Sequence, residues 1–106
     1  MFVKNTPMTA PAPEAKLLVV DDEPNIRDLL ASSLRFAGFD VSTAEDGSSA
    51  FHEAQAVRPD LIVLDVMLPD MDGFTVTRRL RDAGLTTPVL FLTARDDMRD
   101  KIQGLT

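Results

Sequence analysis

Three continuous apolar runs, at residues 17–20, 61–64 and 89–92, constrain the fold of this chain more than any other feature. Uninterrupted runs of this length are typical of strands that are covered on both faces, as in a parallel sheet. A fourth segment, residues 39–44, alternates apolar and polar residues and predicts a more exposed strand. The sequence therefore predicts four short strands.

Segments with apolar residues at helical spacing follow each of the strands. Residues typical of helix ends bound the first three predicted helices. The first begins at Pro24 and ends at Gly38, the second begins at Asp46 and ends at Arg58-Pro59, and the third begins at Asp72 and ends at Gly84. We expect these helices to direct the following residues inward: Ile26, Leu29, Leu30, Leu34, Ala37, Ala50, Phe51, Ala54, Val57, Val76, Leu80 and Ala83. A fourth helix is predicted near the end of the chain, with Met98, Ile102 and Leu105 on one face.

Strands that alternate with helices predict an α/β fold, a doubly wound parallel sheet with helices on both faces. Binding sites in such folds lie beyond the carboxyl ends of the strands, near the point where the strand order reverses. We therefore expect the functional residues to lie at the carboxyl ends of the predicted strands.

Composition excludes several classes of function. The net charge of −6 leaves no basic surface for nucleic acid, and the absence of cysteine excludes disulfides and thiolate-bound metals. No apolar run approaches the roughly 20 residues of a membrane span. Residues 1–15 are polar and proline-dotted, which predicts a flexible tail and no secretory signal. We expect one cytoplasmic domain over residues 16–106, without membrane association.

Acidic side chains follow two of the predicted strands. Asp21 and Asp22 end the first strand and Asp65 ends the third, so neighbouring strands would bring three carboxylates together. Like charges at such distances need compensation, and a hard divalent cation such as Mg²⁺ supplies it. Thr93, at the end of the fourth strand, would add a hydroxyl. A metal-bound carboxylate beside a hydroxyl suggests that an aspartate accepts a phosphoryl group as an acyl phosphate.

Other aspartates have simpler interpretations. A single aspartate after a strand is usually a turn residue or a helix cap. We therefore interpret the following residues as structural: Asp40, Asp46, Asp60 and Asp72. His52 is predicted to lie on the outer surface of the second helix, and Arg78, Arg79 and Arg81 to form a solvated face.

Three motifs resemble those of a response-regulator receiver domain. They are Leu-Val-Val-Asp-Asp-Glu-Pro at 18–24, Leu-Ile-Val-Leu-Asp-Val-Met-Leu-Pro-Asp-Met-Asp-Gly at 61–73 and Val-Leu-Phe-Leu-Thr-Ala-Arg at 89–95. The resemblance covers the chain from about Lys16 onward. It implies a flavodoxin-like fold, with the four strands present here in the order 2-1-3-4.

The resemblance also implies a role for each residue of the acidic cluster. Asp65 would be the phosphoacceptor, with a histidine kinase's phosphohistidine as the donor. Asp22 would contact Mg²⁺ directly and Asp21 mainly through water, while the main-chain carbonyl of Met67 would be a further metal ligand. Thr93 would be the switch hydroxyl.

Residues 95–105 resemble the fourth helix of the winged-helix transcription-factor branch of this family. In that branch an active dimer forms through the fourth helix, and Lys101 would reach an acidic partner across it. DNA would be bound only by a downstream domain that is absent from this chain.

The chain departs from the family pattern at its C-terminus. A complete receiver has a fifth strand ending in a lysine, then an aromatic switch residue and a fifth helix. This chain holds none of these, and no lysine lies between Lys16 and Lys101. We expect residues 1–106 to be an incomplete receiver domain without the family's catalytic lysine.

Alternatives to a phosphorylated switch remain. The absent lysine leaves open an interaction or dimerisation module that is never phosphorylated. An aspartyl-phosphate phosphatase needs a second carboxylate two residues after the nucleophile, where this chain has Met67. A flavin-binding module would be repelled by the acidic residues after the first strand, because phosphate is also negative. We therefore expect no turnover enzyme acting on a small substrate.

Overall fold

A computed structural model of the protein describes residues 15–92. Strands and helices alternate along these residues as β1 (Lys16–Val20), α1 (Pro24–Phe36), β2 (Asp40–Ala44), α2 (Gly47–Val57), β3 (Leu61–Asp65), α3 (Gly73–Asp82) and β4 (Val89–Leu92). The four predicted strands and first three predicted helices are therefore confirmed. Thr93, Lys101 and the helix predicted near the end of the chain lie outside the described residues.

The four strands form one parallel sheet in the order β2-β1-β3-β4. The predicted order of the strands is confirmed. In the register of the central pair, Val20 of β1 lies opposite Leu64 of β3. The residues that directly follow Val20 therefore lie beside Asp65, the last residue of β3.

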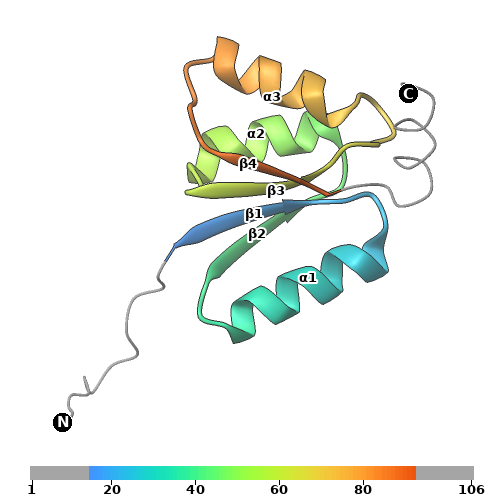
Figure 1. The fold of residues 1–106 in the computed structure, drawn as a ribbon, viewed down its shortest axis with the longest axis vertical. Coiled ribbons are helices and arrows are strands. Elements are labelled where there is room, and N and C mark those ends of the chain that lie inside the picture. The colour runs from blue at the N-terminus through green and yellow to red at the C-terminus, as the bar shows by residue number, and fades with distance from the viewer. Residues whose placement is uncertain (1–14, 93–106) are drawn as a thin grey trace, which may run out of the picture.

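Helices cover both faces of the sheet, with α1 on one face and α2 and α3 on the other (Figure 1). Because side chains alternate along a strand, each face has its own core. Beneath α2 and α3, the strands contribute Leu18, Val20, Ala44, Ile62 and Leu64. Beneath α1, they contribute Leu17, Val19, Val41 and Val63. The central strands β1 and β3 are thus buried on both faces, as their uninterrupted apolar sequences predict.

Three residues predicted to face inward are exposed: Leu29, Ala37 and Ala83. Ala37 lies one residue beyond the end of α1 as its C-cap. Leu29 is 67% exposed because the sheet-facing side of α1 is formed by Ala31, with Leu30 and Leu34 packed beside it. Ala83 lies one residue beyond the end of α3 as its C-cap and is also exposed. The buried apolar residue after α3 is Leu85, which the helical spacing did not identify.

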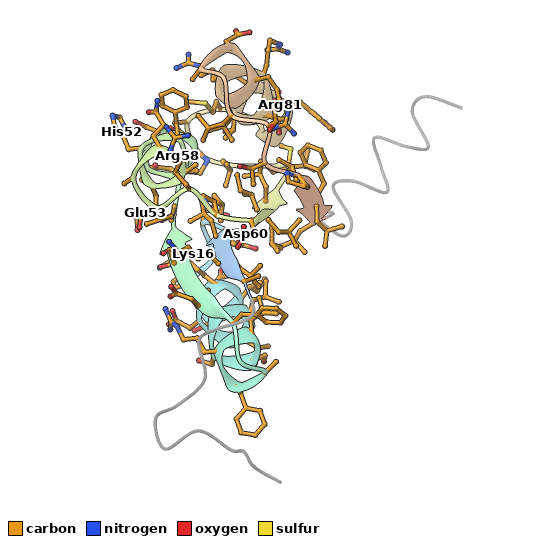
Figure 2. All side chains as sticks on the ribbon, turned by 90° about the vertical axis from the view of Figure 1, so that its left-hand side faces the viewer. Lys16, His52, Glu53, Arg58, Asp60 and Arg81 are labelled. Atoms are coloured by element: carbon orange, nitrogen blue, oxygen red, sulfur yellow. The ribbon has the colours of Figure 1, made fainter. Side chains whose placement is uncertain are left out.

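The strand ends remote from the acidic residues are held by a reciprocal pair of hydrogen bonds (Figure 2). The Lys16 N–H donates to Asp60 Oδ2 at 2.8 Å, and the Asp60 N–H donates to the Lys16 carbonyl at 2.7 Å. Asp60 therefore has the structural role that the sequence predicts. His52 lies on the exposed surface of α2, also as predicted.

Candidate metal centre

Three carboxylates meet at the carboxyl ends of β1 and β3. One oxygen from each of Asp21, Asp22 and Asp65 lies within 4.8 Å of the other two. Asp21 and Asp65 are only 4% and 8% exposed, whereas Asp22 is open to solvent. The structure thus brings together the three aspartates that were expected to converge.

Hydrogen bonds fix the loop that carries Asp21. Its N–H donates to the Ala44 carbonyl at 3.2 Å, which extends the β1–β2 pairing by one residue. Its Oδ1 accepts from the Glu23 N–H at 2.9 Å. Its main-chain oxygen accepts from Arg27 Nη1, also at 2.9 Å. The turn after β1 is therefore held from the sheet and from α1.

Arg27 is a residue that the sequence analysis missed. It is half-buried on α1, and its guanidinium group bonds to the main chain of Asp21. The sequence signal that could have located it is its position on the first helix, one turn after the acidic residues. Its bond partner, a main-chain carbonyl, has no sequence signature.

The segment after Asp65 folds back on itself before α3 begins. The Met67 N–H donates to Asp65 Oδ1 at 3.2 Å, and the Gly73 N–H donates to the Val66 carbonyl at 2.7 Å. Gly73 also lies close to β3, because a Cβ added there would be 2.8 Å from the main-chain oxygen of Asp65. Only a residue without a side chain fits between α3 and the end of β3.

Two aspartates in this segment bond to helix N-termini. Asp72 Oδ1 accepts from the Thr75 N–H at 2.7 Å and caps α3, as its position in the sequence predicts. Asp70 instead accepts from two N–H groups of α2, a contact across 22 and 23 residues that the sequence analysis did not predict. Because N–H groups stabilise the ionised form, the Thr75 N–H lowers the pKa of Asp72 and the Gly47 N–H lowers that of Asp70.

The donor chemistry of the cluster fits a hard divalent cation. All three side chains offer carboxylate oxygens, which Mg²⁺ prefers, and no sulfur or imidazole belongs to the group. Mg²⁺ usually keeps several water ligands, and the exposure of Asp22 leaves that side open to water. The residues present can therefore hold Mg²⁺.

Comparison with known families decides where this chain belongs. The family described as the response regulator receiver domain matches residues 17–106. The chain belongs to this family. Receiver domains are signalling proteins that bind Mg²⁺ at an acidic pocket, and this receiver domain has a cluster of three aspartates.

Curated relatives of this receiver domain are transcriptional regulators. Over 90 residues it is 52% identical to PhoP, the alkaline phosphatase synthesis transcriptional regulatory protein of Bacillus subtilis. Over 90 residues it is 51% identical to TcrX, a probable transcriptional regulatory protein of Mycobacterium tuberculosis. Each match covers 85% of this chain and 38% of the relative, so the chain spans little more than a third of their length.

Solved receiver domains have the same fold. The receiver domain of the Francisella response regulator 1452 is 35% identical, with a TM-score of 0.73 over 87% of this chain and 76% of that one. TrrA of Thermotoga maritima, solved in complex with Mg²⁺ and BeF, is 34% identical, with a TM-score of 0.71 over 85% of this chain and 78% of that one. The predicted flavodoxin-like fold is thus confirmed. Within residues 15–92, none of the helices is long and apolar enough to cross a membrane.

Proposed function

We propose that this receiver domain, spanning residues 16–106, is a phosphorylated switch in a two-component system. The tail predicted at residues 1–15 lies almost entirely outside the described residues. Asp65 accepts a phosphoryl group from the phosphohistidine of a sensor histidine kinase. Mg²⁺ is required, held by Asp21, Asp22 and Asp65 and by the main-chain carbonyl of Met67. The protein acts in the cytoplasm and is no turnover enzyme on a small substrate.

One observation carries this proposal. Asp65 is nearly buried at the end of a central strand, yet two further carboxylates lie within 4.8 Å of it. Concentrated negative charge in a partly desolvated site destabilises the fold unless a cation compensates for it. A structural cap requires one carboxylate, so a cluster of three is better explained by binding of a divalent ion.

The proposed reaction forms one bond and breaks one. A carboxylate oxygen of Asp65 attacks the phosphorus, the P–N bond of phosphohistidine breaks, and the donor imidazole leaves with the electron pair. The Met67 N–H, which donates to Asp65 Oδ1, orients the attacking carboxylate. When bound, Mg²⁺ would reduce the repulsion between Asp65 and the phosphoryl oxygens. Thr93 then donates a hydrogen bond to the transferred group.

Similarity to transcriptional regulators supports the proposed output. Phosphorylation of Asp65 controls a DNA-binding domain in the same protein, and an active homodimer forms through the predicted helix that carries Lys101. The relatives named above are transcriptional regulators, which supports the proposed control of DNA binding, and this chain matches 38% of each of them.

Incubation of the natural full-length protein with Mg²⁺ and acetyl phosphate is expected to add one phosphoryl group. The adduct should be lost in hydroxylamine, as acyl phosphates are, and should not form when EDTA removes the metal. Intact-protein mass spectrometry measures it. A folded protein that gains no phosphoryl group in Mg²⁺ would contradict the proposal and favour an interaction or dimerisation module that is never phosphorylated.

A further inference from the structure

Asp70 joins the loop after Asp65 to the N-terminus of α2. Its Oδ1 accepts from the Gly47 N–H at 2.7 Å and its Oδ2 from the Ser48 N–H at 2.9 Å. Both carboxylate oxygens are thus used, each by a different N–H of the same helical turn. This contact through both oxygens connects Asp70 with Ser48 and Gly47, which lie 22 and 23 residues before it in the sequence.

The contact is additional to the ordinary cap of α2. Asp46 is the N-cap residue, and its Oδ1 accepts from the Ser49 N–H at 2.8 Å. A helix leaves its first N–H groups without intrahelical partners. Asp46 satisfies the N–H of Ser49, whereas Asp70 satisfies those of Gly47 and Ser48. The first turn of α2 therefore obtains two of its three side-chain acceptor contacts from the loop after β3.

Close packing reinforces the same junction. Gly47 is buried, and a Cβ added there would meet the Met71 side chain, with Sδ at 2.8 Å. Asp70 and Met71 thus approach α2 together. Nearer β3, the Met67 N–H bonds to Asp65 Oδ1. The loop is consequently fixed at Asp65 at one end and at α2 three residues beyond Met67.

We propose that Asp70 is a positioning residue of the metal centre, which holds the loop carrying Met67 against α2 so that the Met67 carbonyl and Asp65 keep the geometry that Mg²⁺ requires. This inference rests on the proposed function. Residues that orient metal ligands without touching the metal commonly change its affinity by about 10- to 100-fold when they are replaced.

The chemistry of the contact explains why aspartate is needed. Asparagine has one acceptor oxygen, and its NH₂ group would face the second N–H donor of α2. Asp70→Asn therefore preserves the size of the side chain but keeps only one of the two hydrogen bonds. At the other position, the NH₂ group of asparagine and an N–H of α2 are both donors and face each other without an acceptor. Asp46→Asn is the matched control, because it removes one negative charge from the same helix turn while asparagine remains a good N-cap.

Calorimetric titration of the natural full-length protein with Mg²⁺ tests the inference at a temperature where all variants are folded. Asp70→Asn should weaken Mg²⁺ binding by about tenfold, in the range seen for residues that orient metal ligands. Asp46→Asn should bind within about twofold of the parent, because it keeps its cap. Equal affinities for Asp70→Asn and the parent would overturn the role of Asp70. Absence of binding by the parent would instead contradict the proposed function itself.

A second measurement reports on the contact between the loop and α2 itself. In the parent, the amide NMR signals of Gly47 and Ser48 should shift in proportion to Mg²⁺ saturation, because their N–H groups bond to the loop that responds to the metal. In Asp70→Asn these shifts should be smaller than in the parent at the same Mg²⁺ saturation, because one of the two bonds that join the loop to α2 is lost. Signals that do not move in the Mg²⁺-saturated parent would overturn the inference.

Discussion

Replacement of Asp65 by asparagine is expected to abolish phosphoryl transfer to this protein. The amide nitrogen and oxygen of asparagine carry no net charge, so the nucleophile is lost, along with one of the three carboxylates of the proposed metal site. Asparagine has nearly the same shape and its oxygen can still accept the Met67 N–H, so the fold should persist. Intact mass after incubation with Mg²⁺ and acetyl phosphate should show no adduct in the variant.

Asp60→Asn is the control for this prediction. Asp60 lies at the opposite end of the sheet, where its carboxylate accepts from the Lys16 N–H and an asparagine oxygen can do the same (Figure 2). This variant should gain the phosphoryl group at the rate of the parent. An adduct of equal amount in Asp65→Asn and the parent would show that another residue is the acceptor.

Replacement of Gly73 by alanine is expected to lower the free energy of unfolding by about 1–3 kcal/mol, the usual cost of an overpacked site. In an open helix the same change stabilises by about 0.5–1 kcal/mol. Here the added Cβ would be 2.8 Å from the Asp65 carbonyl oxygen and 3.2 Å from the Val66 Cα. Both are main-chain atoms, which cannot move without displacing the end of β3. Urea denaturation measures the loss, and phosphorylation of Asp65 should also slow.

Gly47→Ala separates a main-chain clash from a side-chain clash. The nearest atoms to a Cβ at Gly47 belong to the Met71 side chain, which is flexible and only half-buried. This variant should therefore be destabilised less than Gly73→Ala. If Gly73→Ala were as stable as the parent, the close approach of α3 to Asp65 would be wrong.

The architecture could be predicted because its determinants are local. Uninterrupted apolar runs identified β1, β3 and β4, and cap residues such as Asp46 and Asp72 marked where helices begin. Parallel strands place their carboxyl ends at one edge, so the proximity of Asp21 and Asp65 followed from their positions at strand ends. The roles of these aspartates in metal binding and phosphorylation remain predictions.

Other features could not be predicted because they depend on which surfaces meet. Leu29 occupies an apolar position of the α1 sequence, but the helix orients Ala31 toward the sheet and leaves Leu29 exposed. Asp70 bonds to main-chain N–H groups of a helix that is distant in the sequence, and Arg27 bonds to the main-chain carbonyl of the turn before its own helix. Every residue type offers such main-chain groups, so the sequence does not identify which of them a side chain will contact. Such contacts are determined by tertiary packing.

Isothermal titration calorimetry of the natural full-length protein with Mg²⁺ tests the central claim most directly. We expect one Mg²⁺ per chain, and a large loss of affinity when Asp21 and Asp22 are both replaced by asparagine, since both changes remove anionic oxygen ligands. The folded state of each sample is verified by circular dichroism. A folded parent that shows no binding heat, released or absorbed, beyond that of dilution would contradict the account. A double variant that binds Mg²⁺ as tightly as the parent would also contradict it.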